Sequence, residues 1–242
     1  DMIDWGKYDV IGFTLGIAQT SASMALAALI RRKFPHVRIV FGGSACLGSQ
    51  AEAILSMCPH IDVIVRGEAE GIVSRLIERL AEGNCVNDLP GLTFRDAGGV
   101  ISDSGSRVVE KIFEPTAEPN YDEYIERMTR YHLRDDTKIM LPFESSRGCW
   151  WGEKTQCTFC GLADNMRYRA RNSEAVLSEI DSLYERYGIR QFFATDLIMP
   201  QEYYTTLLPR VRASGRKYHF YYELKSNLRR EQVGLLSGLV HI

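Results

Sequence analysis

Residues 138–161 read KIMLPFESSRGCWWGEKTQCTFCG and join an apolar run to a loop that carries three cysteines. The run at 138–144 is rich in apolar residues and predicts a β-strand. Cys149, Cys157 and Cys160 follow it with the spacing C-x7-C-x2-C. Loops at the carboxyl ends of strands are where α/β folds bind their ligands, so this stretch predicts a metal or redox site at a strand end.

Three thiolates on one loop have a specific use in metal chemistry. They can ligate three irons of a cubane 4Fe-4S cluster and leave the fourth iron without a protein ligand. A small molecule with an amino group and a carboxylate could chelate that iron, which would bring a sulfonium such as that of S-adenosylmethionine (SAM) next to an electron donor. Cys149, Cys157 and Cys160 are therefore predicted to hold a 4Fe-4S cluster that cleaves SAM to a radical.

Zinc is the alternative metal for these cysteines. Structural zinc prefers four closed ligands, commonly in two closely spaced pairs, and the chain has only one C-x2-C pair. A fourth ligand would have to come from His132 or His219, and neither lies at a metal-type spacing from another ligand. A non-catalytic zinc-binding protein is therefore an open but disfavoured interpretation.

Strands and helices alternate after the cysteine loop. Ser173 is placed to cap a helix that runs to Tyr187 and ends at Gly188. The residue pattern then predicts a strand at 189–195, a helix at 201–213, a strand at 218–224, a helix at 229–236 and the start of a strand at 239–242. This alternation predicts the N-terminal part of a (β/α) barrel, truncated at about its fourth strand.

Three polar residues follow the predicted barrel strands. Asp196 comes after the strand at 189–195, and Glu223 and Lys225 lie at the end of the strand at 218–224. The reactive face of a (β/α) barrel lies at these strand ends, so the three residues are candidates for ligand binding. Local capping or ion pairing is the alternative role for each.

The first half of the chain predicts a parallel sheet. Strands at 8–15, 37–41 and 61–65 alternate with helices at 20–34, 49–57 and 69–80, and a hairpin joins 92–95 to 100–102. Gly42, Gly43 and Gly67 lie at predicted strand ends, where a ligand can approach the backbone closely. Tight turns are the alternative reason for each glycine.

We expect two domains. Residues 1–112 form an incomplete Rossmann-like (flavodoxin-like) α/β domain, residues 113–137 form a crossover with a helix near 121–131, and residues 138–242 form the partial barrel. The first strand reads as a buried one, which suggests that an N-terminal βα portion precedes it.

Composition excludes several classes of protein. The 242 residues carry a formal net charge of −2, and the basic residues are spread along the chain, so no nucleic-acid footprint is present. The longest apolar runs are far shorter than the roughly 18 residues needed to cross a bilayer, which indicates no membrane contact and a cytoplasmic protein. Three of the six cysteines crowd between positions 149 and 160, which is not typical of a secreted disulfide framework.

The cysteine loop resembles a known family. Gly148-Cys149-Trp150-Trp151-Gly152, Cys157-Thr158-Phe159-Cys160-Gly161-Leu162 and Met166-Arg167-Tyr168-Arg169 are similar to the cobalamin-binding radical SAM proteins that mature ribosomally made peptides, several of which are C-methyltransferases. The commonest spacing in the radical SAM superfamily is C-x3-C-x2-C, and the first gap here is longer. The resemblance implies that Phe159 lies near the adenine of SAM. The implied SAM-binding residues are Phe159, Gly161, Asp196, Glu223 and Lys225, although the glycine-rich motif that many members carry near Asp196 is absent. Trp150 and Trp151 are expected to shield the cluster from water, and direct contact with the substrate is the alternative role.

The first domain resembles a cobalamin-binding module. The matching strand ends are Thr14-Leu15-Gly16, Gly42-Gly43-Ser44 and Gly67-Glu68. The sequence contains no D-x-H-x-x-G motif, so the resemblance implies cobalt bound without a histidine from this chain. Cys46 could approach the cofactor or be a small core residue. Cys58 and Cys85 are expected to be structural.

The implied function is C-methylation of an unactivated carbon in a ribosomally made peptide, with a 4Fe-4S cluster, SAM and cobalamin as cofactors. The implied partners are the peptide and an electron donor such as flavodoxin or ferredoxin. Open alternatives are a radical SAM enzyme of other outcome (cyclisation, epimerisation or rearrangement) and a non-catalytic cobalamin-binding or zinc-binding protein. No residue is assigned as a catalytic acid, base or nucleophile.

Overall fold

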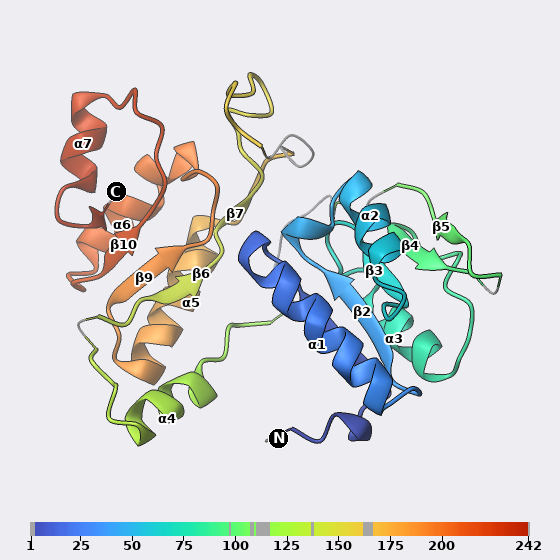
Figure 1. Ribbon diagram of the computed structural model, residues 1–242. Helices are drawn as coiled ribbons and strands as arrows, with labels where there is room; N and C mark the ends of the chain where they lie inside the picture. The colour runs from blue at the N-terminus through green and yellow to red at the C-terminus, as the bar shows by residue number, and fades with distance from the viewer. Residues whose placement is uncertain are drawn as a thin grey trace. The chain divides into compact units, whose positions relative to one another are not determined.

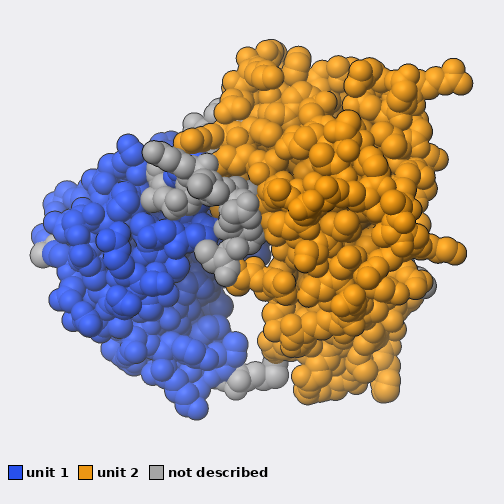
Figure 2. All heavy atoms as spheres, turned by 180° about the vertical axis from the view of Figure 1, so that it is seen from behind, with its two compact units in different colours: residues 1–111 blue, residues 112–242 orange. Residues whose placement is uncertain are grey.

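The computed structural model describes residues 3–96, 98–106, 109, 117–136, 138–161 and 167–241. The chain divides into two compact units, residues 1–111 and residues 112–242 (Figure 2). Each unit has its own sheet and its own apolar core.

Unit 1 contains the predicted parallel strands. β1 (Val10–Thr14), β2 (Arg38–Gly42) and β3 (Val63–Val65) are parallel neighbours, and β4 (Leu92–Arg95) and β5 (Ile101–Asp103) continue the same sheet as an antiparallel hairpin (Figure 1). The helices of this unit are α1 (Thr20–Lys33), α2 (Ser49–Met57) and α3 (Val73–Ala81), with short 3-10 helices at Trp5–Lys7, Ile17–Gln19 and Ser44–Cys46. The predicted βα alternation and hairpin are confirmed.

The register of unit 1 aligns the ends of its parallel strands. Thr14 of β1 pairs with Gly42 of β2, so the loops that follow these two strands start side by side. Alternate β2 residues Ile39 and Phe41 are fully buried in the core. The apolar alternation thus fixes which face of the sheet is covered, and the shared strand end places the glycine loops together.

The first strand differs from its expected burial. Ile11 is the one buried residue of β1, and within the described residues β1 pairs only with β2. The expectation of a buried first strand is therefore wrong, because Gly12 and Thr14 are exposed and Val10 and Phe13 are only partly buried.

Unit 2 contains the predicted βαβαβαβ run. Its four parallel strands lie in the order β11 (Val240–His241), β10 (His219–Tyr221), β9 (Gln191–Ala194) and β6 (Leu141–Phe143) (Figure 1). The connecting helices are α5 (Ser173–Tyr187), α6 (Leu207–Ala213) and α7 (Arg230–Leu236). Phe192, Phe220, Val176 and Ile180 are fully buried between strands and helices. The predicted alternation is confirmed for this half of the chain.

Two helix predictions in unit 2 need correction. Asn172, rather than Ser173, is the N-cap of α5, and its side chain accepts a hydrogen bond of 2.7 Å from the backbone N–H of Glu174. The helix expected at 201–213 is split into a 3-10 helix at Gln201–Tyr204 and α6. Pro209 explains the split, because a proline fits the first turn of a helix but clashes with the carbonyl four residues earlier in a continuous one.

The helix expected in the crossover packs within unit 2. α4 (Asp122–Arg130) contributes Ile125 to the core of this unit. The backbone N–H of Tyr121 donates to the hydroxyl of Tyr187, at 2.8 Å, which ties the start of α4 to the end of α5. Among the residues described in both units, no helix has the length and apolarity needed to span a membrane.

Candidate functional site

The cysteine loop leaves and re-enters unit 2 at a short antiparallel ribbon. β7 (Ser146–Arg147) pairs with β8 (Arg169–Ala170), with Ser146 opposite Ala170 and Arg147 opposite Arg169. Figure 1 shows the loop, in yellow, extending from the end of β7. The sequence predicted the strand before the loop and the helix after it but not this ribbon.

Gly148 is required at the base of the loop. Its φ is +76°, and a Cβ at this position would lie 2.2 Å from the carbonyl oxygen of Arg167 and 3.0 Å from the backbone nitrogen of Tyr168. No larger residue fits this close approach of two backbones. Cys149 therefore starts directly beside the returning chain.

All three cysteines of the loop are free thiols and half-buried. The backbone N–H of Gly152 donates to Sγ of Cys149 at 3.2 Å, and the N–H of Cys160 donates to the carbonyl of Cys157 at 3.0 Å. Hydrogen bonds from backbone N–H groups to the ligand sulfurs are a normal part of iron–sulfur ligation. Leu162 and Met166, which belong to the family-like motif, lie outside the described residues.

The donor set fits a 4Fe-4S cluster by its chemistry. Three free thiols on one loop, one of them already accepting an amide N–H, are the ligands that such a cluster uses. Within the described ranges, no three His, Cys, Asp or Glu side chains come together in position to hold one metal ion. Assembly of the three sulfurs would accompany metal binding, because ligand sites of this kind are coupled to local folding.

The two tryptophans dock the loop on neighbouring strand ends. Nε1 of Trp150 donates to the carbonyl of Met199 at 3.1 Å, and Nζ of Lys225 lies 3.8 Å from the centre of the Trp151 ring. A pocket of about 300 Å³ lies beside them. Its lining residues are Trp150, Trp151, Met199, Gln201, Tyr204, Leu224, Lys225, Asn227, Leu228, Arg229 and Gln232.

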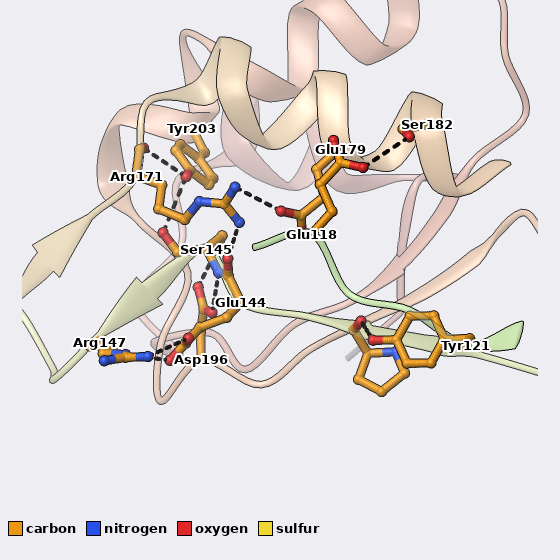
Figure 3. Close-up of polar contacts among 11 residues, drawn as sticks. Glu118, Tyr121, Glu144, Ser145, Arg147, Arg171, Glu179, Ser182, Asp196 and Tyr203 are labelled. Carbon is orange, nitrogen blue, oxygen red and sulfur yellow. Dashed lines mark hydrogen bonds and ion pairs between the residues drawn. The ribbon is translucent and has the colours of Figure 1, made fainter. Parts of the chain in front are cut away.

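Asp196 lies beneath the loop in a buried hydrogen-bond network (Figure 3). Its carboxylate accepts the backbone N–H of Ser145 at 2.8 Å, the hydroxyl of Ser145, and the hydroxyl of Ser146 at 2.9 Å. Burial raises the pKa of Asp196, and the hydrogen bonds from the two serines oppose that rise. The hydroxyl of Ser145 also contacts that of Tyr222 at 2.9 Å. These hydrogen bonds are local contacts that hold the Asp196 carboxylate in place, and SAM binding by Asp196 stays a prediction.

A buried ion pair also stabilises the segments next to the cysteine loop. Arg171 and Glu179 are both almost fully buried and lie 2.8 Å apart. Arg171 also donates to the carbonyl of Glu144 at 2.7 Å, and its own carbonyl accepts the hydroxyl of Tyr203 at 2.9 Å (Figure 3). Sequence reasoning missed these residues, because the contacts join positions that are 8 to 32 residues apart and that no regular spacing connects.

The remaining SAM candidates are accessible. The side chain of Phe159 is 90% exposed, and Gly161 and Glu223 are also exposed. The carbonyl of Glu223 accepts the backbone N–H of Met199 at 2.9 Å, which joins the ends of β9 and β10. Lys225 and Asp196 therefore lie at neighbouring strand ends, as predicted from the alternation, whereas the side chain of Phe159 is exposed on the loop.

In unit 1 the expected cobalamin residues gather at the carboxyl edge of the sheet. Gly43 has a φ of +101°, and a Cβ on it would lie 2.7 Å from the carbonyl oxygen of Leu15. The N–H of Leu15 donates to the carbonyl of Gly42 at 2.6 Å. Thr14, Gly16 and Ser44 flank this contact, and Gly67, with a φ of +99°, and the buried Glu68 follow β3. The side chain of Leu15 is fully buried, so only its backbone faces this edge.

The other three cysteines lie apart from the loop. Cys46 is fully buried in the core of unit 1, and burial raises its pKa to about 11. This supports a core role rather than contact with a cofactor. Cys58 is half-buried and Cys85 is exposed.

The fold resembles those of two solved cobalamin-dependent radical SAM enzymes. The cobalamin-dependent SAM radical enzyme OxsB, solved with aqua-cobalamin and SAM bound, matches 94% of this chain and 33% of its own with a TM-score of 0.69 and 18% identity. The radical SAM methyltransferase TsrM from Kitasatospora setae, solved with cobalamin and a [4Fe-4S] cluster, matches 96% of this chain and 48% of its own with a TM-score of 0.68 and 18% identity.

Proteins of similar sequence include methyltransferases and a cyclase. The uncharacterized methyltransferase PH0819 of Pyrococcus horikoshii is 27% identical over 76% of this chain and 38% of its own length. The anaerobic magnesium-protoporphyrin IX monomethyl ester cyclase of Synechocystis is 27% identical over 71% of this chain and 32% of its own. The cobalamin-dependent radical SAM methyltransferase TokK of Streptomyces tokunonensis is 23% identical over 80% of this chain and 28% of its own. The chain therefore spans about a third of the length of these relatives, and no family model matches it.

Proposed function

We propose that the chain is the cobalamin-binding and cluster-binding part of a radical SAM enzyme that C-methylates an unactivated carbon of a ribosomally made peptide. The observation that carries this proposal is the position of three free thiols on one loop, anchored at the carboxyl end of β6 beside the ends of β9 and β10. The relatives that are methyltransferases support the reaction class, and the motif resemblance supports the peptide substrate.

In unit 2, Cys149, Cys157 and Cys160 would hold the cluster, and the N–H of Gly152 would stabilise charge on the first sulfur. The bound cofactors supply reductive cleavage of SAM and a transferable methyl group. Trp150 and Trp151 would exclude water, since they close the loop against Met199 and Lys225. Phe159, Gly161, Asp196, Glu223 and Lys225 are proposed for SAM, with the buried Asp196 acting through Ser145 and Ser146.

In unit 1 we propose that cobalamin lies along the carboxyl edge of the parallel strands. The close contact of Gly43 with Leu15 leaves backbone rather than side chains at this edge, which permits close approach of a large planar group. The proposed residues are Thr14, Leu15, Gly16, Gly42, Gly43, Ser44, Gly67 and Glu68. Cobalt would be bound without a histidine of this chain. The electron would come from a donor such as flavodoxin or ferredoxin.

A cyclase is the second candidate function. The similarity to magnesium-protoporphyrin IX monomethyl ester cyclases favours it, because the same radical step can lead to ring closure instead of methylation. SAM with an isotopically labelled methyl group distinguishes the two reactions. Label in the product supports the methyltransferase, and an unlabelled cyclised product supports the cyclase.

Anaerobic reconstitution tests the cluster itself. We expect about four iron and four sulfide per chain in the wild type, with the broad visible absorption of a cubane cluster. Cys157→Ala should lose both the cluster and SAM cleavage, whereas the matched variant Cys58→Ala, in unit 1, should retain both. Stoichiometric zinc in place of iron, or a fully loaded Cys157→Ala variant, would contradict the proposal. A shift of the hydroxocobalamin spectrum on mixing tests cobalamin binding separately.

A further inference from the structure

The pocket that Trp150 and Trp151 line, termed the tryptophan pocket, is built on the core of unit 2. Its volume of about 300 Å³ is at the lower end of the range typical of small-molecule sites, roughly 300–1,000 Å³. Three of its lining residues, Met199, Tyr204 and Gln232, are almost fully buried. Part of the lining is therefore fixed by packing before any ligand binds.

The charge of the tryptophan pocket is positive. Lys225 and Arg229 are the charged residues of its described lining, which contains no Asp or Glu. Glu202, Glu223 and Glu231 adjoin lining residues in the sequence, but they are exposed and do not line the pocket. The pocket therefore favours an anionic ligand over a cationic one.

The chain itself supplies no carboxylate to these two cations. Nζ of Lys225 lies over the Trp151 ring, 3.8 Å from its centre, and the side chain of Gln232 accepts the backbone N–H of Arg229 at 2.9 Å. Within the described residues, neither Lys225 nor Arg229 forms an ion pair. An ammonium has three N–H donors, so contact with one ring face leaves donors for a ligand. A carboxylate brought by a ligand would complete the site.

The rest of the lining matches a peptide. Gln201 and Asn227 carry side-chain amides, which can donate to and accept from the groups of a peptide bond. Leu224 and Leu228 are partly buried and offer apolar surface for the methylene groups of a side chain. Cations, amides and apolar surface in one pocket together fit an acidic residue within a peptide.

We propose that the tryptophan pocket binds the carboxylate of an acidic residue in the substrate peptide, with Lys225 and Arg229 as its partners. This inference rests on the proposed function, because it names a feature of the peptide. Arg229, which is not among the proposed SAM residues, is then a residue that determines substrate specificity. Lys225 is also a proposed SAM residue, so SAM is the competing occupant of the pocket.

Two capped tripeptides test the inference in a ligand-observed NMR titration of the anaerobically reconstituted chain. One contains leucine, glutamate and leucine, so the glutamate side chain is its only carboxylate, and the other has glutamine in place of glutamate. We expect the glutamate peptide to bind about tenfold more tightly, as for one hydrogen-bonded charge. Arg229→Gln and Lys225→Gln should each remove most of this preference, whereas Arg229→Lys, which keeps the charge, should retain part of it.

Arg230→Gln is the matched control. Arg230 is exposed and adjoins Arg229 in the chain but does not line the pocket, so this variant should keep the wild-type preference. Equal affinity of the wild type for the two peptides would overturn the inference. So would an equal loss in Arg230→Gln, which would indicate an effect of net charge, or displacement of the glutamate peptide by SAM. A wild-type chain that prefers the glutamate peptide but loads no iron would instead refute the proposed function.

Discussion

Asp196 accepts the backbone N–H of Ser145 at 2.8 Å, which ties the segment between β6 and β7 to the segment after β9. The hydroxyl of Ser145 donates to the same carboxylate, and the hydroxyl of Ser146 does so from the first residue of β7. One buried carboxylate thus fixes the path of the chain into the cysteine loop.

Replacement of this carboxylate should change how stability depends on pH. Burial raises the folded-state pKa of Asp196, so the folded protein holds this proton more tightly than the unfolded chain. The contribution is fully present below the unfolded pKa of about 3.9 and is lost as pH rises through the raised folded pKa. In urea unfolding, the free energy of the wild type minus that of Asp196→Asn should therefore fall as pH rises above about 4. A difference that grows with pH would show a lowered pKa instead.

Replacing only one residue of the buried pair of Arg171 and Glu179 should strongly lower the free energy of unfolding. Arg171→Met leaves the Glu179 carboxylate buried without its counter-ion, and we expect a loss of about 3–5 kcal/mol in the free energy of unfolding. Adding Glu179→Leu should restore part of that loss. Arg210→Met, which breaks an exposed pair with Glu174, should cost less than about 1 kcal/mol. Equal losses for the two single variants would contradict the role of burial.

Gly148→Ala should disturb both folding and cluster loading. The substitution forces a Cβ to within 2.2 Å of the Arg167 carbonyl at a φ of +76°, so the ribbon must open or shift. We expect a loss of about 1–3 kcal/mol in urea unfolding and reduced iron content after reconstitution. Gly234→Ala is the control, because it lies in α7 with open space around it and should be neutral or slightly stabilising. Full iron content in Gly148→Ala would show that the ribbon does not position Cys149.

The extent of alkylation should differ among the cysteines according to their burial. The pKa of Cys46 is raised to about 11, so its thiolate becomes populated only as pH approaches that value, and its side chain is fully buried. In mass spectrometry of the folded protein without a cluster, iodoacetamide at about pH 8 should label Cys149, Cys157 and Cys160 but not Cys46. After reconstitution the loop cysteines should also be protected. Rapid labelling of Cys46 would indicate an opening of the unit 1 core.

The strands and helices were predictable where burial is periodic. The run at 61–65 gave β3, whose three residues are all buried, and the apolar spacing of residues 173–187 gave α5. Pattern alone did not separate the 3-10 helix from α6, because the apolar spacing continues across the break while Pro209 prevents one helix.

The site was predictable only in part. The cysteines could be found because their spacing is itself the signal. The network of Asp196, Ser145 and Tyr222 could not, because it depends on three strand ends meeting in space. The ribbon of β7 and β8 has two residues on each side, too few for any period to show.

The β7–β8 ribbon also explains how a longer first gap between cysteines is tolerated. The two strands that carry the loop, β7 and β8, pair with each other at its base, which is called the stem here. Added residues would therefore lengthen the loop and leave the paired strands in register. The entropic penalty of such lengthening is small, about 0.6 kcal/mol for each doubling of a flexible loop. The stem therefore makes the length of the loop independent of the geometry of the sheet that contains β6 and β9, so the spacing of the first two cysteines can vary without a change in these strands.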